Sequence, residues 1–245
     1  MSALQDLQAK LASMEEELRQ LRLEVQHARD YHAICNLQAA YGYYIDKGLY
    51  DDAADLFAPD GTLEIAGRGV YCGRERVRAY LKRLPPYGRG RLYNHMQLQP
   101  VIHIDVRAGT AKGRWRTLMQ VGGLGAEARW GEATYENEYV RLDEGWRIAK
   151  LHGFINFYCE YDQGWHRGGV PLLRSVEGLA PDRPPTIEYE CYPEPVIAPF
   201  HYPNQRGEYP GMRSGNRLVR DVSVSEEASQ DLFGVDASHP GKAQE

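Results

Sequence analysis

Two side chains of this sequence, Asp46 and His95, are of the types that carry out proton transfer near neutral pH. A carboxylate and an imidazole enclosed in an apolar cavity are suited to general acid–base catalysis. Each residue also has a structural interpretation, because Asp46 stands beside Lys47 and Gly48 at the expected end of a helix and His95 lies in an expected strand. From residue type alone, both interpretations are open.

Strand alternation adds a third acid to this pair. In an expected strand over residues 133–142, Glu136 and Glu138 share one face and Tyr135 lies on the other. That acidic face is either exposed or turned toward a cavity. In the second case, Glu138 joins the catalytic set opposite His95 and Glu136 contacts the substrate.

The same alternation predicts the cavity wall. Trp115, Thr117 and Met119 share one face of the preceding expected strand. Tyr41 is expected to lie at the same cavity, although it could equally be a core aromatic residue. The remaining residues expected to contact the substrate are Tyr44, Ile65, Asn94 and Phe157.

Neither a cofactor nor a metal is expected. His103, His152, His166 and His201 lack the spacing of metal ligands. The segment 122–125 is rich in glycine but is not followed by a helix, so we interpret it as a turn. The four cysteines form no CxxC motif, and we expect them to be reduced.

Composition indicates an ordinary soluble protein. The 245 residues are 42% hydrophobic, with a formal net charge of -5. This charge does not indicate binding to nucleic acid or to a membrane surface. The apolar runs are too short to span a bilayer and the N-terminus does not resemble a signal peptide, so we expect a cytoplasmic protein.

Residues 1–29 carry the clearest periodic signal. Apolar side chains alternate spacings of three and four, as in a coiled-coil seam: Leu4, Leu7, Leu11, Met14, Leu18, Leu21, Val25 and Ala28. We expect an oligomerisation helix and a homo-oligomer, with a trimer favoured over a dimer, although leucine at both seam positions does not distinguish two strands from three. The alternative is an amphipathic helix packed on its own domain.

Residues 30–161 are expected to form an α+β domain. Helical spacing over 34–45 ends at Lys47–Gly48, and short helices are expected at 50–57 and 74–84, with a turn at 59–61 before a strand at 62–66. Four long strands, at 93–104, 111–121, 133–142 and 146–158, then form a curled antiparallel sheet. Proline and aromatic residues dominate 162–217, which indicates an extended arm over this domain or over a neighbouring subunit. Residues 218–245 are expected to be a mobile tail.

The runs YGYYIDKGLYDDAADLFAPDGTLEI, YCGRERVRAYL, NHMQLQPVIHIDVRAGTAKGRWR and YENEYVRLDEGWRIAKLHGF carry a family resemblance. In order and spacing, residues 30–158 resemble the SnoaL-like branch of the nuclear transport factor 2-like superfamily. The resemblance implies a cone, made of a curved sheet wrapped against helices, with a deep pocket. Scytalone dehydratase, ketosteroid isomerase, polyketide cyclases and the small subunits of ring-hydroxylating dioxygenases share this fold, so the fold alone does not select an activity.

The resemblance favours the catalytic interpretation of the acid–base pair. Asp46 and His95 match an aspartate and a histidine that face the cavity in enzymes similar to scytalone dehydratase, although a second histidine of those enzymes has no counterpart at 119–121. The base of ketosteroid isomerase would fall near Ile65, which cannot accept a proton, so that activity is disfavoured. Tyr41 and Glu138 match its tyrosine donor and its protonated acid.

The long form of the sequence, with its N-terminal seam, YGYYIDKG, YENEYV and proline-rich arm, is similar to the diarylpropane γ-formaldehyde lyases of aromatic-degrading bacteria. This resemblance implies cofactor-independent removal of a hydroxyl group and then formaldehyde from a lignin-derived diarylpropane diol, through a quinone methide, to leave a stilbene. A small aromatic or hydrophobic substrate is therefore expected.

Other functions of the same fold are open. One alternative is a dehydratase or polyketide cyclase. Another is the non-catalytic small subunit of a ring-hydroxylating dioxygenase, and a third is a non-catalytic carrier of an apolar ligand. The homotypic seam argues mildly against the dioxygenase subunit, which would need a different partner.

Overall fold

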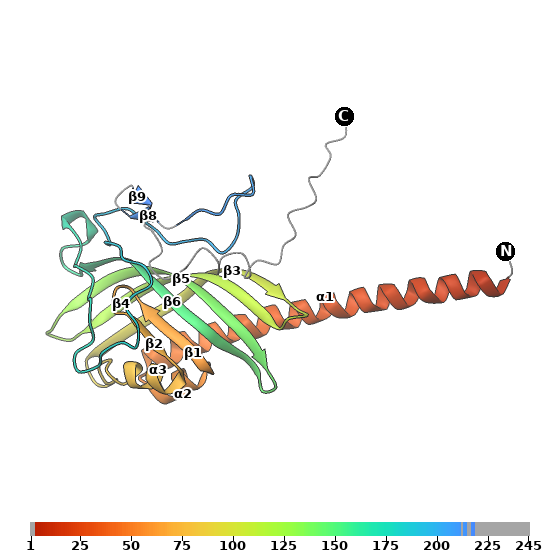
Figure 1. Ribbon diagram of the computed structural model, residues 1–245. Coiled ribbons are helices and arrows are strands. Elements are labelled where there is room, and N and C mark those ends of the chain that lie inside the picture. The colour runs from red at the N-terminus through yellow and green to blue at the C-terminus, as the bar shows by residue number, and fades with distance from the viewer. Residues whose placement is uncertain (1–2, 212, 215–216, 219–245) are drawn as a thin grey trace.

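Six strands form one curved sheet in the computed structural model, which describes residues 3–211, 213–214 and 217–218 (Figure 1). The strands are β1 (Phe57–Ile65), β2 (Val70–Cys72), β3 (Arg91–Asp105), β4 (Thr110–Gly123), β5 (Ala128–Leu142) and β6 (Gly145–Glu160). Their order is β2–β1–β6–β5–β4–β3, and neighbours are antiparallel except for the parallel pair β1–β6. The expected α+β fold with a curved sheet is confirmed.

Short turns allow the long strands to pair with their neighbours in sequence. Gly109, between β3 and β4, and Gly145, the first residue of β6, have φ angles of 67° and 112°. Side chains other than glycine rarely adopt these angles. β1 begins earlier than expected, at Phe57, because the segment 59–61 is an irregularity within the strand rather than a turn before it.

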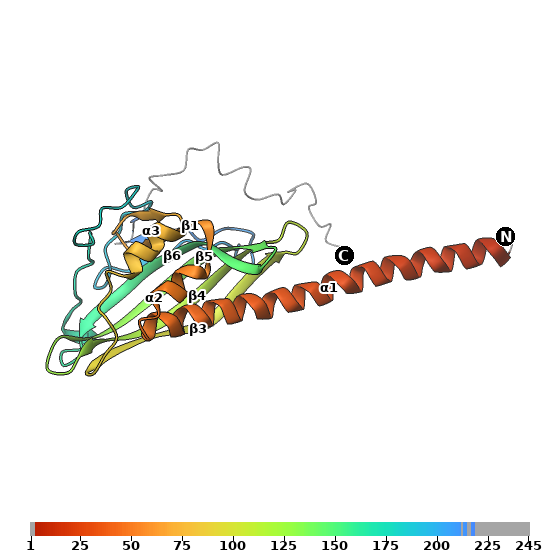
Figure 2. The same cartoon turned by 90° about the horizontal axis from the view of Figure 1, so that it is seen from below.

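Three helices accompany the sheet: α1 (Ala3–Asp46), α2 (Tyr50–Asp55) and α3 (Arg74–Leu81). The C-terminal end of α1, α2 and α3 lie on the same side of the sheet (Figure 2). α1 ends where expected, before Lys47 and Gly48, and the positive φ of 67° at Gly48 is typical of a helix C-terminus. Among the described residues, no helix is both long and apolar enough to cross a bilayer.

The helix α1 has two different halves. Its N-terminal half projects away from the domain (Figure 1), and its seam side chains from Leu4 to Val25 are 48–65% exposed. Burial begins at Asp30, whose carboxylate accepts hydrogen bonds from Trp146 Nε1 at 2.8 Å and Arg141 Nη1 at 2.7 Å. Asp30 therefore ties the helix to the sheet at the point where the seam ends.

A buried polar network joins the second half of α1 to the sheet. Gln38 Oε1 accepts hydrogen bonds from Tyr139 Oη at 2.7 Å and from Asn137 Nδ2 at 3.0 Å. Trp115 Nε1 donates to Tyr139 Oη at 2.9 Å. Because these groups are buried and satisfy one another, they specify how the helix sits on the sheet.

The proline-rich arm after β6 packs on its own domain. It contains the 3-10 helix η1 (Trp165–Arg167) and the short strands β7 (Val196–Ile197), β8 (Arg213–Ser214) and β9 (Arg217–Leu218). Leu172, Ile187 and Tyr189 of the arm are buried in one cluster with Met119 and Phe154 of the sheet. Of the two positions expected for the arm, the structure of the single chain thus shows the arm on its own domain. Of the tail expected at 218–245, residues 219–245 lie outside the described residues.

Candidate active site

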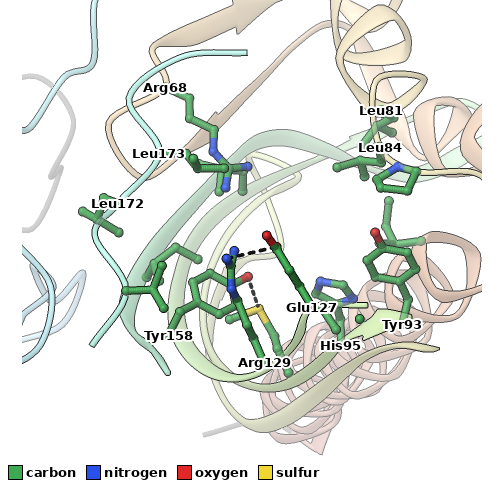
Figure 3. A pocket seen from close by; sticks show the side chains of 18 of the residues that line it. Arg68, Leu81, Leu84, Tyr93, His95, Glu127, Arg129, Tyr158, Leu172 and Leu173 are labelled. Atoms are coloured by element: carbon green, nitrogen blue, oxygen red, sulfur yellow. Dashed lines mark hydrogen bonds and ion pairs between the residues drawn. The ribbon is translucent and has the colours of Figure 1, made fainter. Parts of the chain in front are cut away.

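A cavity of about 580 Å³ lies between the sheet, the helices and the arm (Figure 3). Its wall is largely apolar, with six tyrosines and a few charged groups. The apolar lining includes Ile45, Ile65, Leu81, Leu84, Met119, Val121, Ile155, Leu172 and Leu173. The polar lining includes Tyr41, Tyr50, Tyr80, Tyr93, Tyr135, Tyr158, His95, Arg68, Arg91, Arg129 and Glu127. Enclosed apolar cavities with a few polar groups are the usual sites of small-molecule binding.

Asp46 and His95 form a hydrogen-bonded pair at this cavity. Asp46 is the last residue of α1, and its Oδ1 accepts hydrogen bonds from the main-chain N–H of His95 and from His95 Nδ1, both at 2.9 Å. With an ionised Asp46, Nδ1 carries the proton and Nε2 holds a lone pair. His95 lines the cavity, and Asp46 lies behind it. In this arrangement a carboxylate orients an imidazole that is able to accept a proton at Nε2.

Aromatic residues surround this pair. The Tyr93 ring stacks near His95 with 6.3 Å between centroids. Burial raises the pKa of Tyr41 well above its ordinary value, and neighbouring Tyr135 adds to the effect. The Tyr41 hydroxyl therefore stays protonated and can act as a hydrogen-bond donor in the cavity.

The orientation expected for the two glutamates is wrong. On β5 it is the face of Tyr135 that is buried toward the cavity, so Glu136 and Glu138 lie on the opposite face of the sheet. Glu136 pairs there with Arg114 and accepts from His201 Nδ1 of the arm at 2.7 Å. Neither glutamate lines the cavity, and the acidic group expected opposite His95 is absent from this wall.

On β4, the three residues of the expected wall share the inner face but have different environments. Met119 lines the cavity. Trp115 belongs to the polar network beneath it, and Thr117 is fully buried without lining the cavity. The prediction that these three side chains share one face of β4 is therefore correct. The cavity reaches only Met119, so the prediction that all three line it is wrong.

Two further residues expected to contact the substrate, Asn94 and Tyr44, lie away from the cavity. Asn94 alternates with Tyr93 and His95, and its Nδ2 donates to Gln120 Oε1 at 3.1 Å. Tyr44 packs against the core. Of the residues expected to contact the substrate, Ile65 does line the cavity.

Phe157 is displaced by a β-bulge. The register between β5 and β6 shifts between Glu132 and Ala133, which pair with Phe157 and Ile155. The extra residue reverses which side chains face inward, so Ile155 and Tyr158 line the cavity and Phe157 packs near Trp165 instead, at 6.5 Å between ring centroids.

Sequence reasoning missed the cavity residues that come from turns, α3 and the arm. Arg68 lies in the turn between β1 and β2, Tyr80 lies on α3, and Leu172 and Leu173 belong to the arm. The available signal was the arginine between two glycines at 67–69, where a single charge interrupts an apolar stretch. Within the described part of the chain, no group of three or more histidine, cysteine or acidic side chains is arranged to hold a metal.

Solved structures of similar fold include three dehydrochlorinase structures. The chain is 21% identical to a hexachlorocyclohexane dehydrochlorinase (LinA) Type2, with a TM-score of 0.51 over 56% of this chain and 92% of that one. For the LinA-type3 enzyme from Novosphingobium barchaimii LL02 the identity is 20% and the TM-score 0.51, over 57% and 95%. For LinA the sequence identity is 18% and the TM-score is 0.50, and the match covers 58% of this chain and 95% of that one. These similarities establish the fold.

The family itself follows from a match along the sequence. Residues 26–152 match the model of the SnoaL-like domain. The match includes Asp46, His95 and most of the cavity wall, and it stops before the arm. The chain therefore belongs to the SnoaL-like domain family.

Proposed function

We propose that this protein is a cofactor-independent lyase that acts on a hydroxylated aromatic molecule, with His95 as the base. The observation that carries the proposal is the pair Asp46–His95, because Asp46 orients the imidazole and leaves Nε2 toward an apolar cavity. The structural neighbours named dehydrochlorinases support an elimination, which also requires removal of a proton.

The substrate we propose is a 1,2-diarylpropane-1,3-diol with a phenolic ring. His95 Nε2 takes the phenolic proton, and the benzylic hydroxyl leaves as water after receiving a proton, which gives a quinone methide. The quinone methide then accepts the electrons of the breaking carbon–carbon bond as the terminal CH2OH group loses its proton and departs as formaldehyde. The products are a stilbene, water and formaldehyde, which together balance the diol.

Tyr41 is the donor proposed for the departing hydroxyl. Its high pKa keeps its proton available, and it lines the same cavity as His95. Glu138, expected in this role, lies on the other face of the sheet.

The test is incubation of the purified full chain with this diol, followed by chromatography for the stilbene and a formaldehyde assay. His95→Gln and Asp46→Asn should each lower kcat by about 10²–10⁴-fold, since these are the usual contributions of general acid–base groups. Tyr41→Phe should lower kcat as well. His32→Gln, at an exposed position of α1, is the matched control.

The outcomes separate the proposed lyase from related activities. Loss of water with the carbon skeleton intact would identify a dehydratase. A diol whose phenol is methylated should not react, because it cannot form the quinone methide by losing a proton. Turnover of that methyl ether would contradict the mechanism.

We also propose that the chain is a cytoplasmic homo-oligomer held by the seam of α1. The exposed leucines of this helix find no cover within the described part of the chain. A second and a third copy of the same helix would bury them, and a trimer is the proposed state.

A further inference from the structure

Arg68 lies in the cavity wall on the side opposite His95 (Figure 3). It belongs to the tight turn between β1 and β2, where the Ala66 N–H donates to Gly153 O at 2.8 Å. Gly69 follows with a φ angle of 85°. The backbone of the turn is thus held against β6, and it carries the arginine side chain into the cavity wall.

The Arg68 guanidinium has no carboxylate partner among the described residues. Its Nη1 donates to Tyr80 Oη at 2.6 Å, and its Nε is buried without a hydrogen-bond partner. The other groups that interact with the guanidinium are two tyrosines, Tyr158 and Tyr189. By contrast, Arg129 of the same cavity pairs with Glu127 at 3.0 Å and Glu160 at 3.1 Å.

An unpaired guanidinium in such a wall is costly. A buried donor without an acceptor costs about 1–3 kcal/mol, and more when it is charged. Tyr80 lowers this cost only in part, because its oxygen accepts one of five N–H groups. As this oxygen is already an acceptor, the Tyr80 hydroxyl proton is available for another oxygen in the cavity.

We propose that Arg68 and Tyr80 form a subsite for an acidic oxygen of the substrate, either a phenol or a carboxylate. The inference rests on the proposed function only in the aromatic nature of the ligand. The wall of the same cavity is apolar at Leu81, Met119 and Ile155, which suits aromatic rings. The substrate would then lie with an acidic oxygen of its second ring at Arg68, while the phenol of its reacting ring lies at His95.

The test compares three probes that share the stilbene skeleton: stilbene-4-carboxylate, 4-hydroxystilbene and 4-methoxystilbene. Binding to the full chain is measured by calorimetry. At least one acidic probe should bind about tenfold more tightly than the methoxy probe, since a charge-assisted hydrogen bond contributes this much. Arg68→Met should reduce that preference to within about twofold.

Controls distinguish a binding role from a structural one. Arg68→Lys keeps the charge and loses the forked geometry, so it should retain part of the preference. Arg129→Met removes a cation that already has carboxylate partners, so it should keep the preference. Thermal unfolding of each variant checks that it folds.

Each outcome decides one question. Dependence on Arg68 for the carboxylate probe alone assigns a carboxylate, and dependence for the hydroxy probe alone assigns a phenol. Equal binding of all three probes by the unmodified protein would overturn the subsite, as would a preference that survives in Arg68→Met. Because binding is measured without turnover, failure of the lyase activity leaves this result intact.

Discussion

At the scale of single residues, two histidines of the sheet, His95 on β3 and His152 on β6, have different environments. His95 has Asp46 at 2.9 Å and faces the cavity. His152 is 4% exposed and stacks on Phe154 with 4.0 Å between ring centroids. Position relative to the cavity therefore separates the candidate base from a core histidine.

The buried His152 predicts a pH dependence of stability. Desolvation, with a smaller contribution from Lys150, holds its pKa well below 6.5, even though Glu64 Oε1 lies 3.5 Å from Nε2. Below pH 6.5 the unfolded chain binds a proton that the folded chain does not, so this contribution to stability is present above pH 6.5 and is lost as the pH falls.

The measurement is the free energy of unfolding in urea at a series of pH values that begins above pH 6.5 and continues below it. The unmodified chain should lose up to about 1.4 kcal/mol per pH unit relative to His152→Gln, which does not titrate. His32→Gln should follow the unmodified chain. Parallel profiles for the unmodified chain and His152→Gln would show that His152 is not the titrating group.

At the scale of elements, the contact between α1 and the sheet depends on the buried network of Gln38, Asn137, Tyr139 and Trp115. Tyr139 is central, since its hydroxyl donates to Gln38 and accepts from Trp115. Burial raises the pKa of Tyr139, so the hydroxyl keeps its proton. The network positions the helix whose last residue is Asp46, and it thereby connects packing to the candidate site.

Tyr139→Phe should destabilise the fold by about 1–3 kcal/mol, because it leaves the Trp115 N–H buried without an acceptor. Denaturant unfolding measures this change. Tyr43→Phe, at a position that is 71% exposed, is the control and should change stability by less than about 0.5 kcal/mol. Equal stability of Tyr139→Phe and the unmodified chain would mean that the hydroxyl contributes nothing net.

At the scale of the whole molecule, the charges beside the α1 seam favour a parallel, in-register assembly. With Leu4 at the first seam position of the heptad, residues flanking the seam on neighbouring copies would pair with opposite charge. These pairs are Lys10 with Glu15, Glu17 with Arg22, and Glu24 with Arg29. An antiparallel arrangement would not bring together the same residues.

Sedimentation of the full chain tests this assembly. Leu11→Asp with Leu18→Asp should yield monomers, because two charges would enter the apolar seam. Glu17→Arg should weaken association by about 0.5 kcal/mol per pair, and adding Arg22→Glu should restore it. A monomeric unmodified chain rules out the assembly, and a charge reversal that Arg22→Glu fails to rescue rules out the parallel register.

Local patterns determined much of this protein in advance. The spacing of apolar residues, the glycines at turns and the order of motifs were sufficient for the long N-terminal helix, the α+β class, the long hairpins and the family. The order of motifs also singled out Asp46 and His95, through the family resemblance. These features depend on neighbours in sequence and on motifs of fixed spacing, so they can be recognised without the fold.

Only the tertiary structure decided what faces the cavity. Alternation divides β5 into two faces but does not say which is inner, so Glu136 and Glu138 were turned the wrong way. A bulge moved Phe157 out, and the arm closed the cavity with Leu172. Arg68 meets Tyr80 through the packing of a turn against α3. Such relations arise from register and long-range packing, whereas Asp46 and His95 could be singled out beforehand from residue type together with the family resemblance.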